Sequence, residues 1–281
     1  MSIGAAKSAT TWLYQMFKDH QDIYFSPEKE IHYFAHANTR DWNLNYKERS
    51  KTFTNQAQWI EKVWLKNLTD EEFKQYFEWY ARYLSEPVND EWYMNLFSDR
   101  GGKKYVADFS NSTCFINRRG CRHLKRSFDT VKLVYTLRDP VDRLWSHVKF
   151  HLMWTGKSHL LESYTDDDFI KLANRRNFII NSLYVKNITN FAKTFDESQF
   201  KILFFEDTIN NPIAVLNEIE DFLGIDQRPY ITKSPEKPIN KGVPRPIPDT
   251  IKHAFREILD KQYSGLIKMG FTLPKTWNLD I

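Results

Sequence analysis

Short apolar runs alternate along the chain with longer stretches in which apolar residues recur every three or four positions. The first pattern is typical of buried strands and the second of amphipathic helices. The strongest run, 131–137, predicts a buried parallel strand. The same patterns predict strands before residue 5 and at 22–25, 105–110 and 200–207, and helices at 10–19, 166–195, 211–223 and 249–263. This alternation indicates an α/β fold with a central parallel sheet flanked by helices, in a single domain over residues 1–281.

Residues 38–100 differ from the rest because their apolar positions follow helical spacing alone. One apolar stripe predicts a helix over 54–66. Thr69 and Glu72 form a capping box, which predicts the start of a second helix. We therefore expect a helical insertion between the second and third strands.

Composition and charge exclude few functions. Aromatic residues make up 16% of the chain, and the net charge of +4 favours an anionic ligand without requiring nucleic acid. Cys114 and Cys121 would lie about 10 Å apart on one helix, beyond the roughly 7 Å reach of a disulfide. No apolar run reaches the roughly 18 residues of a membrane span, and Lys7 interrupts any signal-peptide core. These features predict a reduced, cytoplasmic protein without a metal site or membrane anchor.

The first dozen residues, SIGAAKSATTWL from Ser2 to Leu13, carry the first chemical signal. Apolar residues lead into a turn of small residues with one lysine, and an apolar-periodic run follows. A strand, a tight turn and a helix start in this order suit an anion, because the helix start has unpaired N–H donors. The candidate ligands are Lys7 and the loop that follows it: Ser8, Ala9, Thr10, Thr11 and Trp12. The alternative is an ordinary turn with a solvated lysine.

Two further stretches place polar side chains after predicted strands. Glu30 and His32 follow the strand at 22–25, and either is a candidate base. Arg138 follows the strand at 131–137, and Ser146 lies in the helix after it, which together suit a second anion. The alternatives are a local Lys29–Glu30 pair and an Arg138 side chain paired with a nearby aspartate. Asp108 and Ser110 are weaker candidates for contact with a substrate.

These stretches together resemble the sulfotransferase family. Residues 7–12 resemble its 5′-phosphosulfate loop, K-[ST]-G-T-T-W, with Ala9 in place of glycine. Residues 26–34 resemble S-P-x-K-E-x-H-[FY]-F of the heparan-sulfate branch. Residues 137–146 match its 3′-phosphate motif, L-R-[DN]-P-x-[ED]-R-x-x-S, without a gap. A lysine that related enzymes carry near position 108 is missing here.

The resemblance implies a P-loop-like fold and the donor 3′-phosphoadenosine 5′-phosphosulfate, with adenosine 3′,5′-bisphosphate as product and no metal. It implies that Lys7 acts on the leaving oxygen and Glu30 on the acceptor proton, with His32 beside it. It also implies that the donor nucleotide is contacted by the loop 7–12 and by more distant residues, namely Trp12 at the adenine and Arg138, Ser146, Tyr184, Lys241 and Gly242 elsewhere. The insertion 38–100 would then lie on the acceptor side.

The resemblance leaves the acceptor open between a carbohydrate and a small molecule, and between a hydroxyl and an amine. The first alternative function is a P-loop kinase or NTPase, in which Asp139 would bind magnesium. Against this alternative, the sequence lacks the glycine that a Walker motif requires immediately before Lys7. The second is a nucleotide- or glycan-binding protein on the same scaffold without catalysis, which Ala9 and the missing lysine keep open.

Overall fold

The computed structural model describes residues 1–39, 42–63, 69–230, 234–237, 239 and 242–277, with the backbone alone at 59–63. Its strands are β1 (Ser2–Gly4), β2 (Ile23–Phe25), β3 (Tyr105–Ala107), β4 (Leu133–Leu137) and β5 (Phe200–Phe204). Its α-helices are α1 (Thr10–Phe17), α2 (Tyr33–Asn38), α3 (Tyr46–Val63), α4 (Asp70–Leu84), α5 (Asp90–Asn95), α6 (Arg118–Arg126), α7 (Pro140–Trp154), α8 (Leu160–Ser163), α9 (Asp166–Ala173), α10 (Arg176–Ile179), α11 (Tyr184–Ala192), α12 (Phe205–Asn210), α13 (Pro212–Leu223) and α14 (Asp249–Lys268). Short 3-10 turns are η1 (Ser98–Arg100), η2 (Asn111–Phe115) and η3 (Ile180–Ser182).

The strands pair in parallel, as predicted. β4 is the central strand of β1-β4-β5, and β2 pairs with β3. The two groups meet where the Ser2 N–H donates to the Asp108 carbonyl over 2.9 Å. All five residues of β4 are buried, which fits its continuous apolar run. The α/β fold with helices flanking a parallel sheet is therefore confirmed.

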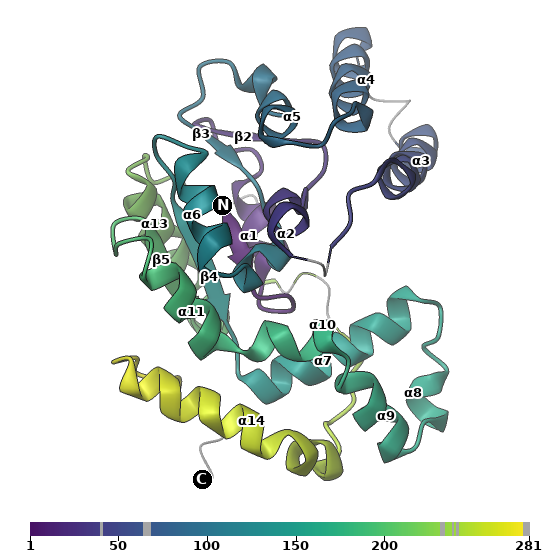
Figure 1. The fold of residues 1–281 in the computed structure, drawn as a ribbon, viewed down its shortest axis with the longest axis vertical. Coiled ribbons are helices and arrows are strands. Elements are labelled where there is room, and N and C mark those ends of the chain that lie inside the picture. The colour runs from purple at the N-terminus through teal and green to yellow at the C-terminus, as the bar shows by residue number, and fades with distance from the viewer. Residues whose placement is uncertain (40–41, 64–68, 231–233, 238, 240–241, 278–281) are drawn as a thin grey trace.

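Two groups of helices lie at opposite ends of the molecule, whereas α6, α11 and α13 lie alongside the strands (Figure 1). Helices α3, α4 and α5 of the insertion gather at one end of the molecule, and α7 to α10 with α14 gather at the other. The larger core joins the strands to α4, α5 and α11, while a separate core lies between α7, α9 and α14. Residues 4–13, called the phosphate-loop segment below, run from β1 into α1 and lie with α2 between the two end groups.

Several predicted elements have the expected type but different bounds. The capping boxes of Thr69 with Glu72 and of Thr165 with Asp168 both form. Helix α3 begins at Tyr46 rather than 54, because the Asn45 side chain accepts the Glu48 N–H at 3.0 Å and starts the helix earlier. Its predicted end at 64–66 lies outside the described residues.

The predicted helix 166–195 is wrong as a single element. It is divided into α9, α10, η3 and α11. Arg175 is extended between α9 and α10, and the buried Arg143 donates to the Phe178 carbonyl at 2.6 Å and to the Ser182 hydroxyl at 2.6 Å. The backbone between α9 and α11 therefore accepts a hydrogen bond from the Arg143 side chain of α7, and sequence periodicity cannot show such a contact.

Other strand and helix ends also move. β3 ends at Ala107 and β5 at Phe204, where α12 begins directly. Helix α14 continues past the predicted end to Lys268. Gly265 lies inside α14 and does not end it. A Cβ at this position would come within 2.4 Å of Val185 on α11, so the glycine allows the two helices to pack closely.

The two cysteines are free, as predicted, although not for the reason of helical spacing. Cys114 lies in η2 and Cys121 in α6, so they do not share a helix. Burial raises the pKa of each thiol to about 12, so both stay protonated at neutral pH.

Candidate active site

The phosphate-loop segment turns sharply between β1 and α1. Lys7 and Ala9 both have left-handed backbone angles, with φ of 71° and 63°. Ala9 is the N-cap of α1, at the position where the family pattern has glycine. Gly4 precedes the turn, and a Cβ there would lie 2.8 Å from the Asn111 carbonyl. The segment therefore needs a small residue at Gly4 and carries backbone strain at Ala9.

Lys7 lies in a cationic environment. Its ammonium is 3.9 Å from the centre of the Phe150 ring on α7. Burial, followed by the charges of Arg138, Lys29 and Arg143, lowers the pKa of Lys7 to about 8. A lysine in this setting gains most from an anion that neutralises it.

Arg138 reaches back to the same segment. Its guanidinium donates to the Lys7 carbonyl at 3.3 Å and lies 4.4 Å from the centre of the Phe205 ring. Its own carbonyl accepts the Tyr184 hydroxyl at 2.8 Å. Tyr184 is fully buried, and its hydrogen bond holds the Arg138 backbone from inside the protein.

Arg143 is a site residue that the sequence analysis did not select. It is fully buried and donates to the Ala6 carbonyl at 3.3 Å, to Ser182 and to Phe178. Within the described residues it forms no ion pair with a carboxylate. Burial, followed by the charges of Arg143 and Lys7, lowers the pKa of neighbouring His147 well below its usual range. The 137–146 motif contains Arg143 and could have indicated it as a candidate, but the sequence does not show that this side chain is buried against the Ala6 carbonyl.

Glu30 is the centre of a second cluster. One of its oxygens lies 3.0 Å from the Lys29 ammonium, and the other lies 3.2 Å from His32 Nε2 and accepts from the Asn111 amide at 2.7 Å. The same Lys29 ammonium donates to Thr11 Oγ1 at 3.2 Å. Lys29 therefore connects the phosphate-loop segment to the candidate base.

These contacts set the ionisation of Glu30. Burial raises its pKa, but the hydrogen bond from His32 and the charges of Lys29 and His32 outweigh burial and lower the pKa to about 2. Glu30 is therefore a carboxylate at neutral pH. The predicted alternative of a local pair with Lys29 is present, but as one part of this larger cluster.

Ser110 and Ser112, just before and within η2, hold His32 in place. His32 Nδ1 lies 2.6 Å from the Ser112 hydroxyl, and its backbone N–H donates to Ser110 Oγ at 2.6 Å. Ser110 in turn donates to buried Asp108, which also accepts the Tyr93 hydroxyl at 2.8 Å. Asp108 and Ser110 therefore support His32 from inside the protein, and Asp108 is only 1% exposed.

Asp139 serves a structural purpose in this structure. One of its oxygens accepts the backbone N–H groups of Val141 and Asp142 at 2.9 and 3.0 Å and caps α7. Its other oxygen accepts the Tyr263 hydroxyl at 2.8 Å. Both oxygens are engaged in holding α7 and α14, and the residue is 6% exposed.

The remaining predicted residues lie at different depths. Ser8 and Thr10 are buried, and Thr11 and Ser146 are half-buried. Trp12 is 6% exposed in the core beneath α1, and its indole N–H donates to the Pro235 carbonyl at 2.9 Å. Gly242 is exposed, and Lys241 lies outside the described residues.

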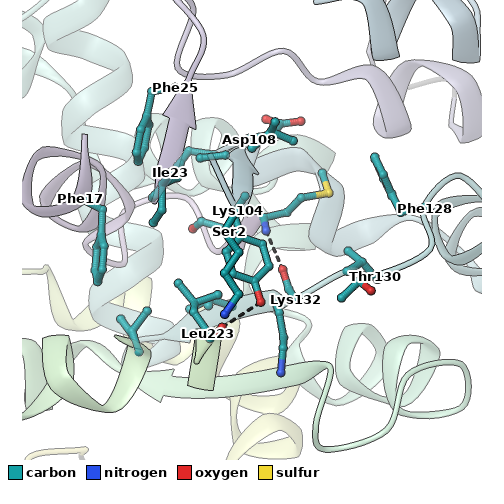
Figure 2. A pocket seen from close by; sticks show the side chains of 18 of the residues that line it. Ser2, Phe17, Ile23, Phe25, Lys104, Asp108, Phe128, Thr130, Lys132 and Leu223 are labelled. Atoms are coloured by element: carbon teal, nitrogen blue, oxygen red, sulfur yellow. Dashed lines mark hydrogen bonds between the residues drawn. The ribbon is translucent and has the colours of Figure 1, made fainter. Parts of the chain in front are cut away.

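A cavity of about 170 Å³ lies away from these clusters, between β3, β4 and the start of β1 (Figure 2). Mostly apolar side chains line it, among them Phe25, Phe128 and Leu223. Neither Lys7 nor Glu30 is among its lining residues. It therefore does not correspond to the predicted donor site.

Comparison with known proteins adds to this geometry. The profile of the sulfotransferase family matches residues 1–229. The chain belongs to the sulfotransferase family. Comparison with curated protein sequences gives no match.

Solved sulfotransferase structures share the fold. The sulfotransferase from Alicyclobacillus acidocaldarius is 19% identical with a TM-score of 0.65, and the alignment covers 98% of this chain and 96% of that one. The sulfotransferase domain from the Synechococcus PCC 7002 olefin synthase is 19% identical with a TM-score of 0.54, covering 99% and 89%. The sulfotransferase domain from the curacin biosynthetic pathway is 17% identical with a TM-score of 0.54, covering 95% of each chain.

The protein is thus a sulfotransferase-family enzyme with the α/β fold of its structural relatives. No helix in the described part of this sulfotransferase is both long and apolar enough to cross a membrane.

Proposed function

We propose that this sulfotransferase moves a sulfuryl group from 3′-phosphoadenosine 5′-phosphosulfate to an acceptor hydroxyl or amine on a carbohydrate or small molecule. The observation that carries the proposal is that Lys29 joins a cluster of cations to a carboxylate. Lys7, Arg138 and Arg143 gather at the phosphate-loop segment, which Lys29 contacts at Thr11, and the same Lys29 ammonium contacts Glu30. The cationic cluster suits an anionic donor, and the carboxylate suits the role of proton acceptor.

The residues of the phosphate-loop segment fit such a donor. The Ser8 hydroxyl is buried and has no hydrogen-bond partner in the part of the chain that the structure describes. Lys7, Ser8, Thr10, Thr11 and the backbone N–H groups of this segment would hold the 5′-phosphate end. Arg138 and Ser146 would hold the 3′-phosphate with Lys241 and Gly242. Tyr184 would contribute by keeping Arg138 in place.

The chemistry follows from charge. The donor supplies an activated sulfuryl group, and negative charge grows on the bridging oxygen as it leaves. Lys7 would stabilise that oxygen, and no metal is needed for this role because the ammonium carries the positive charge. Glu30 would accept the acceptor proton, with His32 keeping the carboxylate oriented.

Lys29 gives Glu30 a way to become a stronger base. A carboxylate with a pKa of about 2 has little tendency to take a proton. An anion bound beside Thr11 gives Lys29 a second negative partner and weakens its hold on Glu30. The pKa of Glu30 then rises when the donor is bound, which is when a base is required.

The geometry gives less support to a magnesium-dependent kinase. Both carboxylate oxygens of Asp139, the candidate metal ligand, are engaged by the α7 N-terminus and by Tyr263. A direct test follows the release of adenosine 3′,5′-bisphosphate from the donor, in the presence of a chelator, as acceptor alcohols and amines are added. Acceptor-dependent release without metal supports the proposal, and release that requires magnesium contradicts it.

A further inference from the structure

Two exposed aromatic side chains contact residues of the candidate site. The Trp42 ring lies 3.7 Å from the His32 ring, centre to centre, and Phe150 lies against the Lys7 ammonium. Trp42 is 38% exposed and Phe150 is 40% exposed. They come from distant parts of the chain, the connection between α2 and α3 and the helix α7. Apolar surface therefore flanks the candidate active site from two elements.

The apolar surface continues outward along α7. Met153 and Trp154 follow Phe150 by three and four positions, which places them one turn further on the same side of the helix. They are 42% and 76% exposed. We call Trp42, Phe150, Met153 and Trp154 the apolar rim. Large apolar side chains grouped in this way at a catalytic centre mark a surface that binds a partner of similar character.

The polar groups beside Glu30 are already engaged with one another. Asn111 donates to Glu30, and Lys29 bridges Glu30 and Thr11. Ser112 is bonded to His32. A ligand rich in hydroxyls would need free donors and acceptors around it, because each buried polar group left unpaired weakens binding. Among the described residues, the side chains of the apolar rim are exposed at this part of the site.

We propose that the acceptor is an alcohol on an apolar body, either an aryl ring system or an alkyl chain. This inference rests on the proposed function. The acceptor hydroxyl meets Glu30, and its body lies along the apolar rim toward Trp154. In the transfer, a bond forms between the acceptor oxygen and sulfur while the bond from sulfur to the 5′-phosphate oxygen breaks. The acceptor proton passes to Glu30, and the electron pair of the broken bond stays on the phosphate oxygen beside Lys7.

The test compares acceptors that share an aliphatic hydroxyl and differ in the rest of the molecule, with the donor present and metal absent. The aryl arm uses 2-naphthalenemethanol, the alkyl arm uses 1-alkanols of increasing length, and the sugar arm uses cellobiose. We expect kcat/KM for 2-naphthalenemethanol or the longer alkanols to exceed that for cellobiose at least about a hundredfold. Along the alkanols it should rise by at most about fourfold per methylene, the limit set by full burial of each group. The arm with the higher value identifies the apolar body as aryl or alkyl.

A variant series locates the effect on the apolar rim. Trp154→Ala should raise KM for the preferred apolar alcohol about tenfold, with kcat and the affinity for adenosine 3′,5′-bisphosphate unchanged. Ile267→Ala is the matched control, because Ile267 is 49% exposed on α14 away from the site. A KM that responds equally to both variants, or to neither, overturns the role of the rim.

Binding of the product nucleotide separates this inference from the proposed function. A protein that binds adenosine 3′,5′-bisphosphate but sulfates none of the apolar alcohols, or prefers cellobiose, contradicts the apolar acceptor alone. A protein that does not bind the nucleotide contradicts the donor assignment on which both depend.

Discussion

The two sides of the candidate active site are built in different ways. The proposed donor side consists of a continuous backbone segment, 4–13, supported by arginines from one neighbouring stretch, 138–143. The acceptor side depends on Glu30 and on side chains that come from far along the chain, since Asn111 lies 81 residues from Glu30. The donor side also collects cations, whereas the acceptor side balances Glu30 against Lys29 and His32.

This difference has a functional consequence. A common donor can be bound by fixed backbone and fixed charge, because it has the same phosphates in every reaction. Acceptors differ from one another, so their site requires a base and a surrounding surface made of side chains, which can change without altering the backbone. Backbone and fixed charge therefore dominate the proposed donor side, whereas the proposed acceptor side combines the motif at 26–34 with side chains from distant segments.

The largest expected effect comes from removing the donor-side charge. Lys7→Ala should lower kcat by roughly a thousandfold, because the leaving oxygen loses its positive partner in a partly buried site. Binding of adenosine 3′,5′-bisphosphate should weaken far less, since Arg138 and Arg143 remain. Steady-state kinetics with calorimetric nucleotide binding checks both, and Lys171→Ala on the exposed face of α9 is the control. A loss of affinity with kcat unchanged would show that Lys7 binds the donor without a special part in the chemical step.

The next effect comes from the acceptor side. Glu30→Gln should lower kcat by roughly a hundredfold or more, because the base is lost. Nucleotide affinity should stay the same or increase, because Lys29 no longer has the Glu30 charge as a partner and can bind the anion more strongly. Glu28→Gln is the matched control, since Glu28 is buried two residues away and accepts a hydrogen bond from Tyr80. Full activity in Glu30→Gln together with an inactive His32→Ala would move the base to His32.

The pH dependence of nucleotide binding gives a smaller effect. The pKa of Lys7 in the free protein is lowered to about 8, so its charge is present below that pH and is lost above it. Affinity for adenosine 3′,5′-bisphosphate should therefore fall by several-fold between pH 7 and pH 9. Lys7→Arg keeps its charge over this range and should flatten the fall. The same slope in both proteins would place the titration on another group.

The smallest effect concerns the strained turn. Ala9→Gly should raise the free energy of unfolding by less than about 1 kcal/mol, because relief of the left-handed strain exceeds the added freedom of the unfolded chain only slightly. Ala81→Gly, at an exposed position inside α4, should lower it by about 1 kcal/mol. Urea denaturation measures both. A loss of stability in Ala9→Gly similar to that in Ala81→Gly would contradict the strain at this position.

Local patterns made much of the fold predictable. The apolar run of β4, the Thr69 and Thr165 capping boxes and the strand-to-helix turn at Lys7 each depend on neighbouring residues, and the structure has all of them. The break in the predicted helix 166–195 depends on Arg143 reaching the Phe178 carbonyl. The extension of α14 depends on the fit of Gly265 against Val185. Such tertiary contacts leave no periodic signal.

The same division holds for the site. Lys7, Glu30, His32 and Arg138 could be selected because motifs surround them. The fully buried position of Arg143, the Lys29 bridge to Thr11 and the Ser112 contact with His32 join segments whose closeness only the folded chain reveals. Trp12 shows the converse, because its motif suggested an adenine contact and the structure places its ring in the core, with its indole N–H bonded to Pro235.

Calorimetric titration with adenosine 3′,5′-bisphosphate, ADP and ATP, all without metal, tests the donor assignment most directly. The cationic donor side predicts that the 3′-phosphorylated nucleotide binds at least about a hundredfold more tightly than ADP or ATP, because only it can occupy the second anion position near Arg138. A preference for ATP, or binding that appears only when magnesium is added, would contradict it.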